Sequence, residues 1–184
     1  IVDPGSEAIK IKAYIEKMQL LPLGIFNTHG HYDHIGGVDY LKNEYNVPFF
    51  LHSGDYKLMK SANLYVKLFE GKEFITIPSI DHYIDQTKFP YSIGNFSLNY
   101  ISTPGHTEGS ICIFIDNLLF SGDTLLKGAV GRTDLPGANK ESLNDSLKLI
   151  TQLPKEMKVF PGHGSSTSIA NELNNMVNII SLGN

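Results

Sequence analysis

The stretch NTHGHYDHIGG, residues 27–37, decides how the fold of this chain is interpreted. Three histidines and one aspartate stand within six consecutive positions of this stretch, ahead of two adjacent glycines. These four residues are His29, His31, Asp33 and His34. Neutral imidazoles and carboxylates are the groups that zinc and similar ions bind, and burying so many titratable groups without an ion would be costly. The stretch therefore predicts a metal site at this point of the chain.

The residues on either side of this stretch predict a strand that turns into a helix. Residues 23–28, LGIFNT, have the pattern of a buried strand, and Ile35, Val38 and Leu41 recur at helical spacing. Loops at strand ends hold functional groups without disturbing a core. We therefore expect the four polar side chains to converge on one point.

Three further polar residues repeat this arrangement downstream. His106 in STPGHTEGS, Asp123 in LLFSGDTL and His163 in KVFPGHG each follow an apolar run and lie beside glycine, which lets the backbone approach a shared centre closely. Seven ligands are too many for one tetrahedral zinc ion and suit two divalent ions that share a carboxylate and a water. Because hydroxide between two such ions is a nucleophile at neutral pH, a hydrolase is expected.

No competing nucleophile or nucleotide-binding motif is evident in the sequence. Cys112 lies in the apolar run ICIFI, where a buried inert thiol is expected. The chain has no G-x-S-x-G elbow, no G-x-G-x-x-G motif and no phosphate-binding loop. His52 and His82 lack the Gly/Pro setting of the other five histidines, and we expect structural or solvated roles for them.

Composition excludes several classes of protein. The 184 residues are 41% hydrophobic and 18% charged, which suits one domain with a substantial core. The formal net charge is −4 and no dense Lys/Arg run occurs, so nucleic-acid binding is not expected. No apolar run approaches the roughly 20 residues that span a bilayer, and the first residues have no leader pattern. One cysteine cannot form an internal disulfide, and a cytoplasmic protein is expected.

The remaining pattern predicts alternating strands and helices around a central β-rich segment. We expect Ser6 to cap the first helix and short strands, beginning with the FITI run at residues 74–77, between residues 74 and 123. Other expected elements are a strand at 47–52, helices at 54–69 and 139–153, a strand at 158–163 and a C-terminal helix. This order predicts a layered α/β (α+β) fold.

Taken in order, THGHYDHIGG, TPGHTEGS, SGDTLL and FPGHG resemble the metallo-β-lactamase superfamily over residues 2–168. The resemblance implies a four-layer αββα sandwich in which residues 1–184 form a single domain. The family has two strands ahead of IVDPG, so the domain is expected to be N-terminally incomplete. The C-terminal helical domain that binds glutathione in full-length glyoxalase II is not expected.

The resemblance also assigns roles to the seven candidate ligands. It implies that one ion is held by His29, His31 and His106, and the other by Asp33, His34 and His163. Asp123 would bridge the two ions, and Asp33 would also act catalytically by orienting the hydroxide. Zinc is the expected metal, although such ligands also suit iron and manganese.

Within the superfamily, GDTLLKGAVGRTDLPG followed by PGHG resembles the short bacterial type of glyoxalase II-like hydroxyacylglutathione hydrolases. The resemblance implies hydrolysis of small thioesters such as S-lactoylglutathione. The commonest metallo-β-lactamases have cysteine in place of Asp123, and flavodiiron proteins have glutamate in place of His31. Both branches are therefore disfavoured.

The resemblance places Arg132 where the longer enzymes have a lysine that grips glutathione, and Asp134 where they have a glutathione-binding tyrosine. The guanidinium of Arg132 is suited to bind a substrate carboxylate bidentately. The alternative is a buried pair with Asp134 or another acid that shapes the loop.

Three alternatives remain open. A persulfide dioxygenase would use one iron held by the equivalents of His29, His106 and Asp123; it shares GRTD with this chain but differs around the last histidine, where this chain has PGHGSSTSI. A metal-binding scaffold without turnover is disfavoured by the complete ligand set. A nuclease is disfavoured by the acidic balance. The sequence leaves the oligomeric state open.

Overall fold

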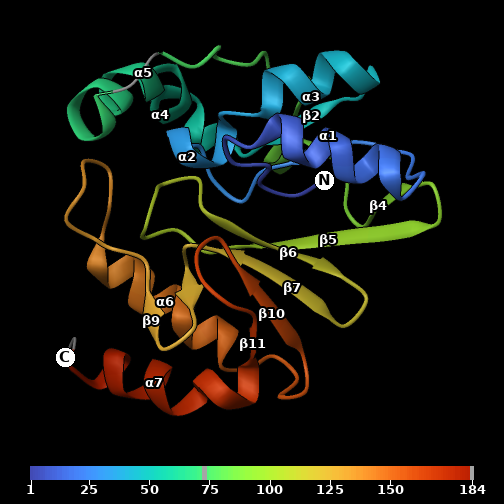
Figure 1. The fold of residues 1–184 in the computed structure, drawn as a ribbon. Coiled ribbons are helices and arrows are strands. Elements are labelled where there is room, and N and C mark those ends of the chain that lie inside the picture. The colour runs from blue at the N-terminus through green and yellow to red at the C-terminus, as the bar shows by residue number, and fades with distance from the viewer. Residues whose placement is uncertain (72–73, 183–184) are drawn as a thin grey trace. The chain divides into compact units, whose positions relative to one another are not determined.

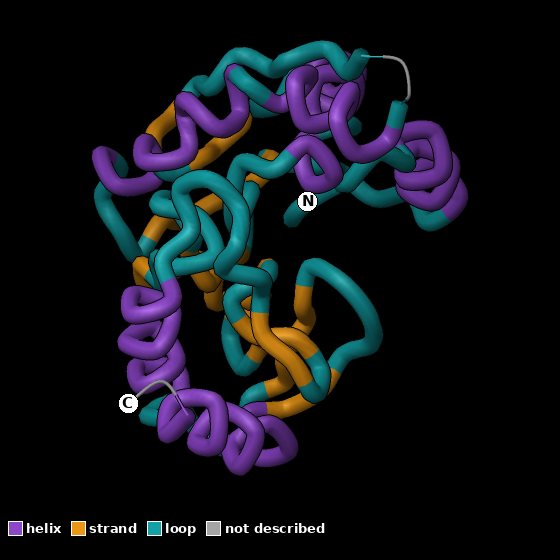
Figure 2. Tube along the Cα trace, turned by 90° about the vertical axis from the view of Figure 1, so that its left-hand side faces the viewer, coloured by secondary structure: helices purple, strands orange, loops and turns teal. Residues whose placement is uncertain are grey.

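The chain divides into two units, Ile1–Lys88 and Phe89–Asn184, each with its own hydrophobic core. The computed structural model describes residues 1–71 and 74–182. Helices and strands occur in both units (Figures 1 and 2), which confirms the predicted mixed α/β class. Among the described residues, no helix has the length and apolar character needed to cross a membrane.

The first unit is built on a three-stranded parallel sheet. Its strands are β1 (Ile25–Phe26), β2 (Phe49–Leu51) and β3 (His82–Tyr83), in the order β1-β2-β3. Val2 adds an isolated parallel bridge to Phe26. Every residue of β1 and β2 is buried, as expected for short apolar runs in a parallel sheet.

Helices pack on this sheet through a cluster that includes Ile25, Phe49 and Leu51. The helices of the first unit are α1 (Ala8–Lys17), α2 (Tyr32–Ile35), α3 (Val38–Tyr45), α4 (Tyr56–Lys60) and α5 (Ala62–Tyr65), followed by a π-helical turn at Val66–Glu70. Two 3-10 turns lie at Ser53–Asp55 and Ile84–Gln86. The expected helix at 54–69 is thus a series of short helical segments.

Two local predictions were wrong. Helix α1 begins at Ala8 with Glu7 in the capping position and no side-chain cap; a Cβ placed on Gly36 would lie 3.3 Å from the Cα and Cβ of Ser6, so Ser6 packs against that glycine. The FITI run is not a strand. Instead, the amide of Asn63 accepts from Ile75 N–H at 2.9 Å and donates to Ile75 C=O at 3.0 Å. A side chain thus provides the hydrogen bonds that a neighbouring strand would supply.

The second unit contains a six-stranded sheet in the order β11-β10-β7-β6-β5-β4. Its strands are β4 (Tyr91–Ile93), β5 (Phe96–Ser102), β6 (Ile111–Ile115), β7 (Leu118–Gly122), β10 (Lys158–Pro161) and β11 (Thr167–Ser168). All neighbours are antiparallel except β10 and β7, which run parallel. A separate hairpin follows β7 and consists of β8 (Leu125–Leu126) and β9 (Ala129–Val130).

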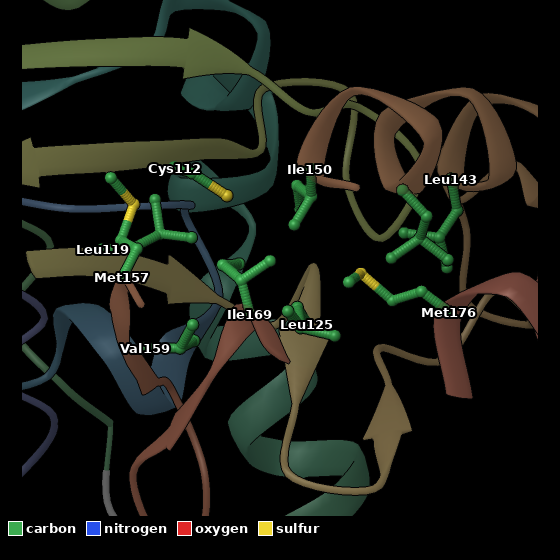
Figure 3. Packing of buried hydrophobic residues seen from close by; sticks show 10 residues of the cluster. Cys112, Leu119, Leu125, Leu143, Ile150, Met157, Val159, Ile169 and Met176 are labelled. Carbon is green, nitrogen blue, oxygen red and sulfur yellow. The ribbon is translucent and has the colours of Figure 1, made fainter. Parts of the chain in front are cut away.

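Helices α6 (Lys140–Ile150) and α7 (Ile169–Leu182) pack against this sheet. Figure 3 shows Ile150 and Leu143 of α6 and Met176 of α7 in the same cluster as Leu119 of β7 and Val159 of β10. The side chain of Asn139 caps α6 by accepting from Ser142 N–H at 2.8 Å. The helix expected at 139–153 is therefore confirmed.

Two leucines of α6 test the importance of this core. Leu147 is fully buried, whereas Leu149 on the same helix is 54% exposed. Leu147→Ala should lower the free energy of unfolding by about 2–5 kcal/mol, because it leaves a cavity in a packed core. Leu149→Ala is the matched control and should change it by less than about 0.5 kcal/mol. Urea unfolding followed by circular dichroism measures both, and equal losses would contradict the assigned packing.

Candidate metal centre

The first unit gathers three imidazoles immediately after β1. The ring centroids of His29 and His34 lie 4.0 Å apart, and those of His29 and His31 lie 4.8 Å apart with the rings nearly perpendicular. All three histidines are buried. Asp33 is more exposed, and its Oδ2 lies 4.0 Å from Nε2 of His34. The expected convergence of the first motif is therefore present within this unit.

Asp3 fixes the tautomer of His29 through the hydroxyl of Thr28. Its Oδ2 accepts from this hydroxyl at 2.6 Å and also lies 3.2 Å from Nδ1 of His34. Because the Thr28 hydroxyl has used its proton, it accepts from Nδ1 of His29 at 3.1 Å. The imidazole of His29 thus has the lone pair on Nε2, as metal ligands with a hydrogen-bonded second nitrogen do.

The sequence interpretation missed Asp3. Ligand atoms of Asp3, His29 and His34 lie within 4.8 Å of one another, and the carboxylate of Asp3 lies on the Nδ1 side of the His34 ring. The backbone of Asp3 has φ +41°, in the left-handed region that aspartate tolerates better than most residues. The only signal in the sequence was an acid directly before the Pro-Gly turn.

A second missed acid, Asp55, shapes the backbone of the motif. It is buried, and its Oδ2 accepts from Gly30 N–H at 2.8 Å. A Cβ on Gly30 would lie 3.0 Å from the Cβ of Asp55 and 3.1 Å from its carbonyl oxygen. Glycine is therefore favoured between His29 and His31, because any side chain would push against the 53–55 turn.

The second unit brings together the other three predicted ligands. Asp123 follows β7, His106 follows β5, and His163 follows β10. Oδ2 of Asp123 lies 3.6 Å from Nε2 of His106 and 3.5 Å from Nε2 of His163. Asp123 and His106 are largely buried, whereas the side chain of His163 is 53% exposed.

Main-chain atoms after the β8–β9 hairpin orient His106. The carbonyl oxygen of Arg132 lies 2.9 Å from Nδ1 of His106, and since a carbonyl only accepts, Nδ1 donates and the lone pair is on Nε2. A Cβ on the preceding residue, Gly131, would lie 2.1 Å from the carbonyl oxygen of Asp123 and 2.9 Å from the His106 ring. Only glycine fits between these two predicted ligands.

The guanidinium of Arg132 forms a bidentate pair with Asp134. Its Nε and a terminal nitrogen donate to the two carboxylate oxygens at 2.7 and 2.8 Å. The bond from Arg132 lowers the pKa of Asp134 to about 2. Both side chains are more than half exposed, so the pair weighed in the sequence analysis exists but lies at the surface rather than buried.

Three residues were not predicted to bind metal or substrate: Cys112, His52 and His82. Burial raises the pKa of Cys112 to about 12, which agrees with the expected inert thiol. Nδ1 of His52 accepts from Gly54 N–H at 3.1 Å and begins the 53–55 turn. His82 is exposed and stacks on Phe50 with a centroid distance of 4.8 Å.

The donor chemistry of each unit fits divalent metal ions. His29 and His106 each have a hydrogen-bonded Nδ1 and a lone pair on Nε2. The carboxylate of Asp33 lies near Nε2 of His34, and that of Asp123 lies near Nε2 of His106. Imidazole and carboxylate ligands suit zinc, iron and manganese.

Comparison with known proteins identifies the family. The family model described as the metallo-beta-lactamase superfamily matches residues 1–163. The chain therefore belongs to the metallo-β-lactamase superfamily. This confirms the family that the motifs of the sequence predicted. It is 39% identical over 177 residues to the probable metallo-hydrolase YqgX of Bacillus subtilis, with 94% of this chain and 82% of the relative covered. It is 32% identical over 181 residues to the hydroxyacylglutathione hydrolase GloC of Haemophilus influenzae, with 94% of this chain and 82% of the relative covered.

Solved structures share the fold. The BLEG-1 B3 metallo-beta-lactamase is 34% identical with a TM-score of 0.87, over 94% of this chain and 84% of its own. TTHA1623 in a di-iron-bound form is 34% identical with a TM-score of 0.80, over 94% and 85%. ETHE1 from Myxococcus xanthus is 25% identical with a TM-score of 0.73, over 98% and 73%. The predicted metallo-β-lactamase fold is thus confirmed.

Asp3→Asn tests the tautomer assignment. The substitution replaces one carboxylate oxygen with an NH2 group that donates, so the Thr28 hydroxyl loses the acceptor that leaves it free to accept from Nδ1 of His29. Zinc affinity should fall about 10- to 100-fold, as when other hydrogen-bond partners of ligands are removed. Titration against a chromogenic chelator measures this. Asp39→Asn on α3 is the control, because this carboxylate accepts from the exposed Asn43 side chain at 3.2 Å. Equal affinities in the two variants would contradict the assignment.

Proposed function

We propose that this protein is a dinuclear metal-dependent hydrolase of small thioesters, similar to glyoxalase II. The observation that carries the proposal is a pair of buried imidazoles, those of His29 and His106, whose Nδ1 is held by a protein acceptor and whose Nε2 keeps its lone pair for a metal ion. Similarity to GloC and YqgX supports the hydrolase class. In this proposal residues 1–184 form a single domain.

The proposed ligand sets follow the superfamily. His29, His31 and His106 would hold one ion, and Asp33, His34 and His163 the other. Asp123 would bridge the two, which agrees with the position of its Oδ2 next to two imidazoles of the second unit. Zinc is the proposed metal; the di-iron form of TTHA1623 makes iron the principal alternative.

The reaction consumes one water and one thioester. Bound ions would supply a hydroxide nucleophile at neutral pH and polarise the carbonyl group. The water oxygen forms a bond to the carbonyl carbon, the bond from that carbon to sulfur breaks, and the products are a carboxylic acid and a thiol. Asp33 would orient the attacking water by accepting a hydrogen bond from it. A thiolate is a good leaving group, so a dedicated general acid is not required.

Arg132 is proposed to bind a carboxylate on the substrate. The guanidinium already holds the carboxylate of Asp134 bidentately, which is the geometry that a substrate carboxylate would use. Asp134 would therefore compete with an anionic substrate for this group.

Two other activities of the superfamily are supported by particular neighbours. Similarity to BLEG-1 favours β-lactam hydrolysis as a second candidate. Similarity to ETHE1 favours a persulfide dioxygenase with one iron. We propose neither as the main function, because the chain has the acids and histidines for two ions and has 32% identity to GloC. A small-molecule substrate in the cytoplasm, without nucleic acid or membrane, stays a prediction.

Metal content and substrate assays on the purified protein test these proposals together. The expected result is two ions per chain with hydrolysis of S-lactoylglutathione or another small thioester. One iron with oxygen uptake on glutathione persulfide would establish the dioxygenase instead, and hydrolysis of a chromogenic β-lactam alone would establish the lactamase. Bound metal with none of these activities would leave the scaffold alternative.

Asp123→Ala tests the bridging role. The variant should lose at least about 99% of thioester hydrolysis and bind less metal, because it removes the carboxylate shared by both proposed ions. Activity assays and elemental analysis measure the two effects. Asp145→Ala, which removes an exposed acid paired with Lys148, is the control. Unchanged turnover in Asp123→Ala would refute the assignment.

Arg132→Ala tests substrate recognition. It should raise KM about tenfold for thioesters with a carboxylate on the thiol half, because a hydrogen bond to a charged group is lost. Metal content should not change, since the bond to His106 uses the main-chain carbonyl. Asp134→Asn should lower KM by releasing the guanidinium. An unchanged KM in both variants would remove Arg132 from the substrate site.

A further inference from the structure

Glu172, in the first turn of α7, is a buried acid outside the predicted ligand sets. Its side chain is 3% exposed and accepts three hydrogen bonds. The donors are the Thr167 hydroxyl at 2.7 Å, Gly128 N–H at 2.8 Å and the Asn175 amide at 3.0 Å. Burying a carboxylate is costly unless such bonds compensate it. Burial alone would raise the pKa of Glu172, but these bonds and the Lys127 charge lower it below its usual range.

One of the three donors, Gly128, lies in the turn of the β8–β9 hairpin with φ +75°. Only two residue pairs form the hairpin ladder, Leu125 with Val130 and Leu126 with Ala129. Hairpins this short are marginal without tertiary support. The hydrogen bond that Gly128 N–H donates to Glu172, 44 residues away in sequence, stabilises this turn.

This hairpin connects one predicted ligand, Asp123, with the main-chain acceptor of another, His106. Asp123 stands two residues before β8, and Arg132, whose carbonyl oxygen holds Nδ1 of His106, stands two residues after β9. Gly131 is wedged between the carbonyl of Asp123 and the ring of His106. A change in the hairpin would therefore move the acceptor that fixes the His106 tautomer.

We propose that Glu172 is a positioning residue for the metal centre. It anchors the β8–β9 hairpin at Gly128 and so holds the Arg132 carbonyl against His106. The inference rests on the proposed function, in which His106 and Asp123 are ligands. It adds a residue of the C-terminal helix that none of the motifs includes.

Variants of Glu172 and of Thr167 separate positioning from general stability. Glu172→Ala removes all three acceptor contacts, including the contact with the hairpin. Glu172→Gln keeps the size and one acceptor oxygen, so it should restore part of the function and remains informative if the alanine variant does not fold. Thr167→Val is the matched control, because it removes a bond to the same carboxylate and leaves the bond to Gly128.

Two measurements report on the second unit without any substrate. Zinc affinity is measured by competition with a chromogenic chelator, and the Nδ1–H proton of His106 is followed by NMR in the metal-free protein. Glu172→Ala should weaken zinc binding about 10- to 100-fold and make the His106 proton exchange faster with solvent. Glu172→Gln should lie between this variant and the unmodified protein, and Thr167→Val should bind zinc as the unmodified protein does.

The proposal is overturned if both Glu172 variants bind zinc like Thr167→Val and keep the same His106 signal, whatever their loss of stability. Failure of the proposed function would look different. In that case the unmodified protein would hydrolyse no thioester, whereas zinc affinity and the His106 signal would still decide the role of Glu172.

Discussion

Hydrogen bonds that fix the protonated nitrogen of an imidazole are the interactions on which this structure depends. A neutral imidazole has two tautomers, and only one of them directs the Nε2 lone pair towards an ion. Asp3 selects this tautomer for His29 through the Thr28 hydroxyl. A main-chain carbonyl, that of Arg132, does the same for His106. The sheets matter for chemistry because they bring these acceptors to the ends of particular strands.

Close backbone approach is the second constraint. A Cβ on Gly30 would crowd the neighbouring turn, and Gly131 has the Asp123 carbonyl and a histidine ring where any side chain would stand. The constraint at both positions is one of space, because neither residue has a positive φ. This distinguishes them from Gly128, which lies in a hairpin turn with φ +75°.

The sequence predicted those features that are carried by local pattern. The motif at 27–37 gave the converging imidazoles, and Asn139 followed by an amphipathic run gave α6. Features that depend on distant partners could not be predicted. Asp3 and Asp55 are single acids whose roles arise only when a turn folds against residues about 25 positions away. The FITI run has a strand pattern, but the side chain of Asn63 occupies its hydrogen bonds. That the ligands of the two units meet at one centre stays a prediction from the family.

Arg132 uses its two ends for separate tasks. Its carbonyl oxygen orients a histidine, and its guanidinium faces Asp134 at the surface. Every amino acid has a carbonyl oxygen, so replacing this residue changes what the surface can recognise and leaves the histidine contact in place. Evolution can therefore change the side chain at this position without removing the acceptor of His106.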